Sequence, residues 1–160
     1  MSVQEPLYPN EPSRFNANDI EDFIQWSTSI DTSDVTIQNE EEIFCEIHGR
    51  MKRTTKRKLS KAEVMDIIGG IYKSDGAVAK LNGGEDVDLP WTVKVSRDKS
   101  LRFRVNMTSI FTNGHKGYSI TIRTIKNRAP LLEDLKLPKD ILDNISPKTG
   151  LVMIVGATGS

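Results

Sequence analysis

The spacing of apolar residues predicts a helix near the N-terminus. Its apolar side chains recur every three or four positions, as on one face of a helix: Ile20, Phe23, Ile24 and Ile30. Asn18, followed three positions later by Glu21, resembles a capping box at the helix start. Trp26 lies off this stripe, and we expect it to make a second packing contact. Before the helix, two prolines favour an extended segment over 7–15, which we expect to lie as a clip on the surface.

Alternating apolar positions then predict two short strands joined by an acidic turn at 39–42. The alternating residues are Val35, Ile37, Ile43, Cys45 and Ile47. Glycine at position 49 permits the next turn, and the basic stretch 50–58 is expected to continue as a strand or an extended arm. The first part of the chain therefore combines a helix with sheet strands.

The clearest helix start in the chain follows this basic stretch. Ser60 and Glu63 have the spacing of a capping box, and Leu59 is expected to pack against Val64 as a hydrophobic staple. The buried face of this helix is predicted to contain Val64, Ile67, Ile68, Ile71 and Tyr72. The two glycines at 69–70 each destabilise the helix by up to about 1 kcal/mol relative to Ala. Another segment must therefore approach closely there, or the helix end must fray. A short helical turn is expected over 77–81.

Three further segments predict an antiparallel meander with one apolar and one polar face. The alternation in 87–95 indicates a strand, and Pro90 places it at a sheet edge. In the second strand, Leu101, Phe103, Val105 and Met107 point one way and Arg102, Arg104 and Asn106 the other. A loop is expected over 113–117. In the third strand, Tyr118, Ile120 and Ile122 take the apolar face and Ser119, Thr121 and Arg123 the polar face.

The end of the chain has the pattern of a buried strand that enters a phosphate-binding loop. A short helix is expected before Pro147, and the wholly apolar run 151–155 follows it. The first five positions of the pattern G-x-x-x-x-G-K-[ST] are then filled by Gly156, Ala157, Thr158, Gly159 and Ser160. The Lys and Ser/Thr that complete this motif would lie beyond Ser160. We expect 147–160 to be poorly packed, because a parallel strand needs neighbouring strands.

The composition of the chain limits the possible class of protein, its compartment and its metal sites. The chain has 160 residues, of which 37% are apolar and 28% charged, which is typical of a soluble globular protein with one solid domain and an appendage. No apolar run approaches the length of a membrane span, and a secretory signal is not evident, so we expect the cytoplasm. Cys45 is the only cysteine, and the two histidines do not complete a zinc site. We expect no metal site within this chain.

The charges are segregated although the net charge is zero. Residues 1–48 contain eleven acidic residues against Arg14 alone, and residues 50–61 contain seven basic residues and no acidic one. The basic stretch 50–61 has two possible functions. It could be a binding module that contacts nucleic acid or an anionic membrane surface, or it could contact the acidic pole of a neighbouring subunit. We favour the subunit contact, because no aromatic residue interrupts the basic stretch to support base stacking.

Arginines on the polar face of the meander are the candidate functional residues. Arginines on a strand usually face solvent and have no further role, and this would be the ordinary interpretation of Arg102, Arg104 and Arg123. Next to a phosphate-binding loop, however, a rigidly held guanidinium matches phosphate oxygens and stabilises charge during phosphoryl transfer. This hypothesis fails if the side chains of Arg104 and Arg123 lie on opposite faces of the sheet, or if carboxylates of the same domain hold them locked.

Several stretches resemble the DotB/TraJ-type ATPases, which belong to the PilT-like secretion ATPase superfamily and serve Dot/Icm type IVB secretion and conjugation. The resemblance rests on LYPNEPSRF (7–15), SDVTIQ (33–38), RFRVN (102–106), IRTI (122–125) and GLVMIVGATGS (150–160). It implies an α+β fold with a PAS-like N-terminal domain over 1–126, a mainly antiparallel sheet and flanking helices. A linker at 127–138 and the truncated start of a RecA-like ATPase domain at 139–160 would follow.

The resemblance also implies a function. The parent would be a homohexameric ATPase that uses ATP and magnesium, is cytoplasmic and peripheral to the inner membrane when assembled, and works with secretion or conjugation machinery. Arg104 and Arg123 match the family arginines that reach the nucleotide phosphates across the interdomain cleft, with Arg102 in reserve. Gly156 to Ser160 match the first half of Walker A. The segment itself is expected to be inactive, since the Walker A Lys and Ser/Thr are absent from it.

Overall fold

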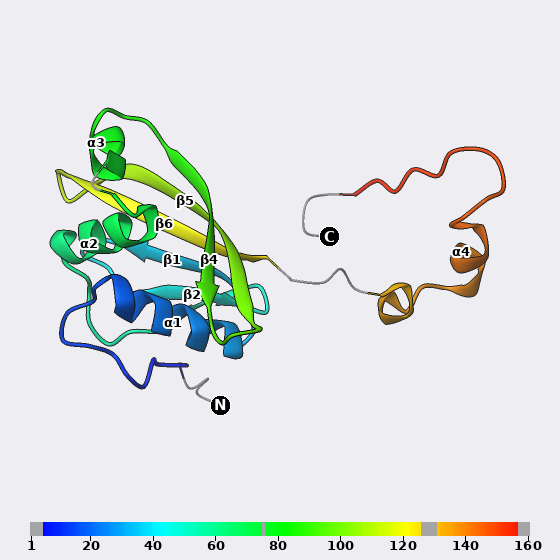
Figure 1. The fold of residues 1–160 in the computed structure, drawn as a ribbon, viewed down its shortest axis with the longest axis horizontal. Coiled ribbons are helices and arrows are strands. Elements are labelled where there is room, and N and C mark those ends of the chain that lie inside the picture. Colours follow the sequence, from blue (N-terminus) through cyan, green and yellow to red (C-terminus); the bar gives the residue numbers. More distant parts are fainter. Residues whose placement is uncertain (1–4, 75, 126–130, 157–160) are drawn as a thin grey trace. The chain divides into compact units, whose positions relative to one another are not determined.

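The computed structural model describes residues 5–74, 76–125 and 131–156. The chain divides into two compact units, Met1–Asn127 and Arg128–Ser160, and each is treated separately below. The prediction of an α+β fold is confirmed, since the first unit contains helices and one antiparallel sheet (Figure 1).

The first unit has three helices and six strands among its described residues. In chain order they are α1 (Ala17–Ser29), β1 (Thr32–Gln38), β2 (Phe44–Ile47), β3 (Arg50–Arg53), α2 (Lys61–Tyr72), α3 (Gly76–Asn82), β4 (Val87–Lys94), β5 (Ser100–Thr112) and β6 (His115–Ile125). The strands form one sheet in the order β3-β2-β1-β6-β5-β4, and every neighbouring pair is antiparallel. Pro90 therefore does lie in an edge strand, as its missing N–H requires.

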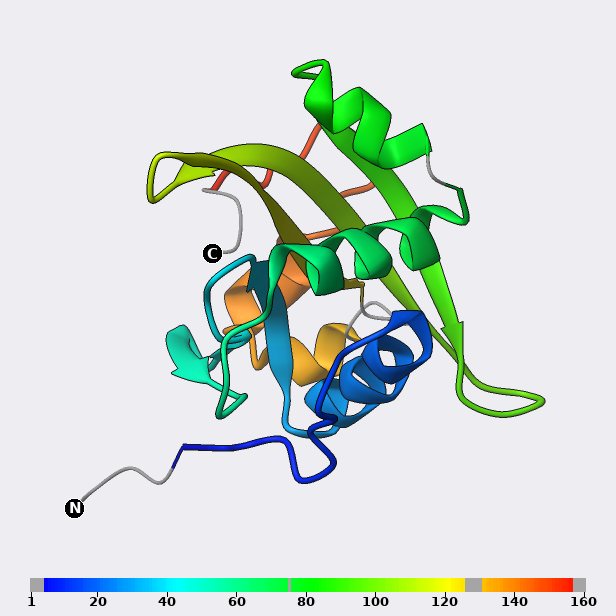
Figure 2. The ribbon, with the colours of Figure 1, turned by 90° about the vertical axis from the view of Figure 1, so that its left-hand side faces the viewer.

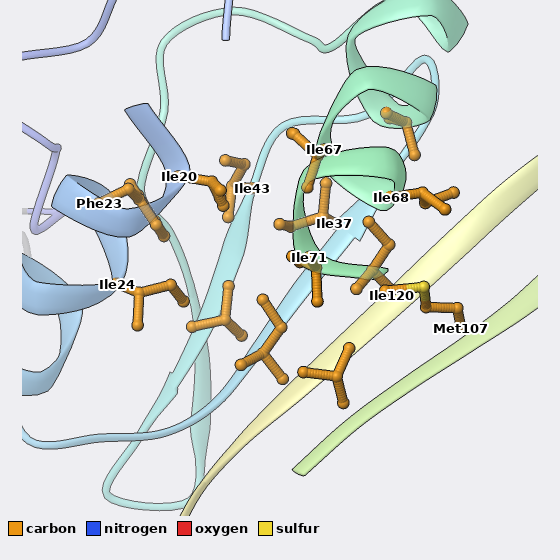
Figure 3. Close-up of a cluster of buried hydrophobic side chains, with 14 of the residues drawn as sticks. Ile20, Phe23, Ile24, Ile37, Ile43, Ile67, Ile68, Ile71, Met107 and Ile120 are labelled. Atoms are coloured by element: carbon orange, nitrogen blue, oxygen red, sulfur yellow. The ribbon is translucent and has the colours of Figure 1, made fainter. Parts of the chain in front are cut away.

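Helices α1, α2 and α3 cover one face of the sheet, and the hydrophobic core lies between them and the strands (Figure 2). Figure 3 shows side chains of α1 and α2 that meet those of the sheet and of the residue just before β2. The helical residues are Ile20, Phe23, Ile24, Ile67, Ile68 and Ile71, and they face Ile37, Met107 and Ile120 of the strands and Ile43 before β2. The helical stripes and the alternating strand positions predicted from the sequence thus form one core. The opposite face of the sheet carries polar side chains on β5 and β6, and a few apolar ones such as Phe44 and Met51 on β2 and β3.

The first helix begins two residues earlier than predicted. Asn16, not Asn18, is the N-cap: its side chain accepts hydrogen bonds from the N–H groups of Asn18 and Asp19, and Asp19 accepts one from the N–H of Asn16. Both asparagines have an acidic residue three positions later, so the sequence spacing alone did not separate them. The predicted cap of α2 is confirmed, with Ser60 and Glu63 forming a reciprocal box.

The glycine pair in α2 marks a close approach between two helices. A methyl group added at Gly70 would overlap with the side chain of Ala17, at the start of α1. Glycine thus lets α1 and α2 pack together more closely than any larger residue would allow. This confirms the first of the two alternatives that the sequence left open.

The segment before α1 is a clip, as predicted. The backbone N–H of Tyr8 donates to the carbonyl of Thr54 at 2.8 Å, and the ring of Tyr8 lies 5.2 Å from the rings of both Phe23 and Trp26. Phe15 is fully buried, so the clip contributes to the core at both ends. Trp26 is a packing contact.

The turn between β5 and β6 is shorter than the loop predicted over 113–117. Only Asn113 and Gly114 separate the two strands, with φ angles of 51° and 78°. Two consecutive positive φ angles are typical of the type I′ hairpin turn, which Asn-Gly favours. The strands therefore pair without interruption up to Thr112 and His115.

The second unit contains two short helical segments among its described residues, η1 (Leu132–Leu135) and α4 (Lys139–Asn144). The helix expected before Pro147 is confirmed. The predicted strand at 151–155 does not form: these residues have no regular secondary structure, and Ile154 is 85% exposed. A strand requires a hydrogen-bonded neighbour, and the only described sheet belongs to the first unit. The expectation that this stretch is poorly packed is confirmed.

Candidate functional site

The polar face of the sheet forms as predicted. On β5, Phe103, Val105 and Met107 are buried beneath the helices, so Arg102, Arg104 and Asn106 point to the opposite face. The same alternation on β6 sends Thr121 and Arg123 to that opposite face, because Ile120 and Ile122 are buried. The two candidate arginines therefore lie on the same side of the sheet.

The strand register brings these side chains together in two adjacent pairs. Arg104 lies directly opposite Arg123, and Asn106 lies directly opposite Thr121. The reserve residue Arg102 lies opposite Ile125 instead. Between the two pairs the surface has a shallow hollow of about 330 Å³, whose remaining lining residue is Asp88 of β4. The geometry thus places Arg104, of the two alternatives, beside Arg123.

Four of the five residues that line the hollow carry hydrogen-bond donors. Two guanidinium groups, an amide and a hydroxyl converge from neighbouring positions on two strands. Guanidinium groups bind phosphate oxygens through two parallel hydrogen bonds, and strand positions hold them more rigidly than loops do. The donor set therefore fits a phosphate group.

Each arginine also has an acidic neighbour. The Nε of Arg123 donates to Oδ1 of Asp34 at 2.8 Å, and its Nη2 lies 3.5 Å from Oδ2. This hydrogen bond and the charge of Asp34 raise the pKa of the Arg123 guanidinium further above its usual value. The Nε of Arg104 lies 3.5 Å from Oδ1 of Asp88. Asp34 comes from β1, a strand whose proximity to Arg123 the sequence alone did not reveal, and Asp88 comes from β4, the first strand of the predicted meander.

Both arginines remain accessible to solvent despite their carboxylate partners. The side chains of Arg123 and Arg104 are 65% and 70% exposed, so the cationic member of each pair lies at the surface. Such pairs contribute about 0–1 kcal/mol and are screened by salt. Two guanidinium groups directly opposite each other also repel, and an anion between them would relieve that repulsion. The site is therefore open to an anionic ligand.

The predicted phosphate-binding loop falls largely outside the described residues. Gly156 is described, belongs to the second unit and is exposed, whereas Ala157, Thr158, Gly159 and Ser160 lie outside. In the described part of the chain, no cluster of three or more His, Cys, Asp or Glu side chains has an arrangement that would hold a metal ion. Likewise, none of the described helices has the length and apolarity needed to cross a bilayer.

Three of the seven basic residues in the stretch 50–61 form ion pairs within the chain. Arg53 pairs with Glu5, Arg57 with Glu63 at 2.6 Å, and Lys58 with Glu41 at 3.6 Å. The acidic partners are Glu5, just before the clip, Glu41 in the β1–β2 turn and Glu63 in α2. The favoured contact with the acidic pole of another subunit stays a prediction, and in this structure these three basic residues have partners in their own chain. The same pairing reduces the charge available to nucleic acid or anionic lipid.

Comparison with solved structures places these observations in a family. The X-ray structure of the ATPase DotB from Legionella pneumophila matches 97% of this chain at 37% identity, with a TM-score of 0.90. DotB from Yersinia pseudotuberculosis matches 91% at 18% identity (TM-score 0.80), and the pilus retraction motor PilT, solved with bound ADP, matches 88% at 22% identity (TM-score 0.61). The last two likenesses establish the shared fold alone.

The chain spans about two fifths of the length of these relatives, namely 42%, 41% and 39%. No protein-family model matches it, and a search of curated proteins found no match. The assignment therefore depends on the likeness to the Legionella protein, which combines substantial identity with nearly complete coverage of this chain. The chain belongs to the DotB-type secretion ATPases.

Proposed function

We propose that this chain is the PAS-like N-terminal domain and the beginning of the RecA-like domain of a homohexameric secretion or conjugation ATPase. In the full-length protein, ATP with magnesium would be held by the Walker A loop that begins at Gly156. Arg104 and Arg123 would contact the phosphates of this ATP. The protein would work in the cytoplasm, at the periphery of the inner membrane, with neighbouring subunits and the secretion machinery.

The observation that carries this proposal is the cross-strand pairing of Arg104 with Arg123 above a donor-lined hollow. A polar face that served only for solvation would not need two like charges directly opposite each other, because that arrangement is unfavourable. Phosphoryl transfer, in contrast, requires preorganised positive charge where negative charge develops. The likeness to the Legionella ATPase DotB supports a nucleotide as the ligand class.

The residues of the hollow have different roles in this proposal. The two guanidinium groups bind phosphate oxygens and stabilise the negative charge that develops on the transferred group. Asn106 and Thr121, one residue further along the same face of each strand, donate neutral hydrogen bonds that orient the phosphate. These residues supply one half of the nucleotide site in this proposal.

The test is steady-state ATP hydrolysis by the full-length protein with Arg104→Ala or Arg123→Ala. We expect kcat to fall by about two orders of magnitude or more, as for arginines that stabilise phosphoryl transfer, with a much smaller change in nucleotide affinity. Arg14→Ala is the matched control, because Arg14 is equally exposed and paired at 2.7 Å with Asp66. If kcat is unchanged in both hollow variants, the arginines do not belong to the nucleotide site.

The alternative function, a basic binding module, is tested by titrating this chain against duplex DNA and anionic vesicles at two salt concentrations. The internal pairing of Arg53, Arg57 and Lys58 predicts weak binding to both. Tight binding that falls steeply with salt would support the module instead.

A further inference from the structure

The two arginines of the hollow are held by their carboxylates in different ways. Arg123 donates from Nε at 2.8 Å and from Nη2 at 3.5 Å to the two oxygens of Asp34, whose side chain is only 15% exposed. Arg104 makes a single 3.5 Å contact with Asp88, whose side chain is 51% exposed. The first pair is a two-point contact to a largely buried partner, and the second is a loose contact between two exposed groups.

The two carboxylates also differ in where they lie relative to the hollow. Asp34 is the direct cross-strand partner of Arg123 on β1 and does not line the hollow. It therefore holds Arg123 from behind and leaves the open side of the guanidinium available. Asp88 lines the hollow itself, next to the two donor pairs. An anion that enters would meet the negative charge of Asp88 directly.

We infer that Asp34 and Asp88 divide the arginine pair into a fixed and a movable member. Asp34 is a positioning residue that holds the guanidinium of Arg123 at one orientation, and Asp88 engages Arg104 until a phosphate displaces it. This inference rests on the proposed function, because the phosphate is that of the nucleotide.

Electrostatics gives the two aspartates opposite effects on the reaction. Removing the charge of Asp88 takes away repulsion of the incoming phosphate and frees Arg104, so binding should improve. Screening by solvent and salt limits the gain to about 3- to 10-fold. Removing the charge of Asp34 leaves the guanidinium of Arg123 without its orienting partner. Misplacement of a group by about 1 Å can cost up to about 100-fold in rate, so kcat should fall by about 10-fold or more.

The experiment compares Asp34→Asn, Asp88→Asn and the control Asp66→Asn in the full-length protein, by ATP hydrolysis and thermal unfolding. We expect KM for ATP to fall 3- to 10-fold in Asp88→Asn with kcat within about twofold. In Asp34→Asn we expect kcat to fall about 10-fold with KM within about threefold. Asp66→Asn, which breaks the exposed pair with Arg14, should change neither. If Asp34→Asn and Asp88→Asn change the same kinetic constant in the same direction, the division of roles is wrong.

A second measurement separates this inference from the proposed function. In the 160-residue chain without nucleotide, the Nε–H signal of Arg123 should be observable by NMR and protected from solvent exchange, and that of Arg104 should exchange rapidly. Asp34→Asn should abolish the protection at Arg123. Equal exchange at both arginines in the wild-type chain overturns the inference, even if both arginines prove essential for turnover. Protection at Arg123 together with full turnover of both alanine variants would instead refute the proposed function alone.

Discussion

Replacing Glu63 by Gln should weaken the whole first unit, because one buried carboxylate joins three segments. Its oxygens accept hydrogen bonds from the N–H of Phe15 in the clip, from the N–H and hydroxyl of Ser60, and from both terminal nitrogens of Arg57. The side chain of Glu63 is only 6% exposed. A glutamine would turn one acceptor into a donor that faces these donors, so several hydrogen bonds would be lost together.

The pKa of Glu63 sets the size of the effect. Burial by itself would raise this pKa, but hydrogen bonds from Arg57, Ser60 and Phe15 outweigh burial and lower it from 4.5 to about 2. A carboxyl group whose pKa is lowered on folding stabilises the fold above its unfolded pKa, and that stabilisation is lost as the pH falls toward the folded pKa. At 1.36 kcal/mol per unit, the contribution is about 3 kcal/mol at pH 7. It falls to about half of this at pH 3.

The assay is urea unfolding of wild type and Glu63→Gln at pH 7 and pH 3. We expect the variant to lose about 2–3 kcal/mol of unfolding free energy at pH 7, and a clearly smaller amount at pH 3. Glu41→Gln is the control, since its carboxylate pairs with Lys58 at 3.6 Å and is 43% exposed. The control should lose less than about 0.5 kcal/mol. A loss for Glu63→Gln that is the same at both pH values would show that shape and packing, not charge, account for its effect.

Three further predictions concern the packing of the first unit. Gly70→Ala should lower the free energy of unfolding in urea by about 1–3 kcal/mol, despite the higher helix propensity of Ala, because the new methyl group overlaps with Ala17. Adding Ala17→Gly should recover part of that loss, and simple additivity of the two effects would refute the contact. Gly117→Ala should also lose about 1–3 kcal/mol, since its methyl group would overlap with the side chain of Asn39, and an unchanged unfolding midpoint would contradict this. Burial raises the pKa of the Cys45 thiol to about 11, so alkylation at pH 8 should be slow in the native protein and accelerate only in denaturing urea; rapid native alkylation would refute its burial.

Periodicity predicted the elements of the first unit well, because burial and alternation coincide there. The apolar positions of β5 and β6 are the ones that face the helices, and the edge position of β4 followed from Pro90. The errors lie at element ends, where several residues satisfy the same rule. Asn16 and Asn18 both fit an N-cap, and only the packed helix decides between them. At 151–155, an apolar run predicted a strand, but strand formation depends on a partner that local sequence does not reveal.

The candidate site was predictable only in part, for a related reason. Alternation placed Arg104 and Arg123 on one face, and Asn106 and Thr121 were visible as their neighbours on that face. Asp34 was not predictable, because β1 precedes β6 by about eighty residues and nothing local indicates that these strands pair. Asp88 lies on the first strand of the predicted meander, but the meander alone does not fix the register that brings it beside Arg104. The internal ion pairs of Arg53, Arg57 and Lys58 were missed for the same reason. Charge segregation along the sequence says nothing about how close the opposite charges lie in the fold.

The register that joins the two arginines is set far from them, at the turn of the hairpin. Pairing runs without a bulge from Thr112 and His115, beside the turn, to Arg102 and Ile125. Since the Asn113-Gly114 turn has two residues, Arg104 and Arg123 are equally distant from it, at about 30 Å along each strand. A turn one residue longer would shift one strand by one position and send its polar residues toward the core. The buried residues of both strands, from Phe103 to Ile122, oppose such a shift. The hydrophobic core thus fixes the face on which each guanidinium lies, and the turn fixes which residue lies opposite it.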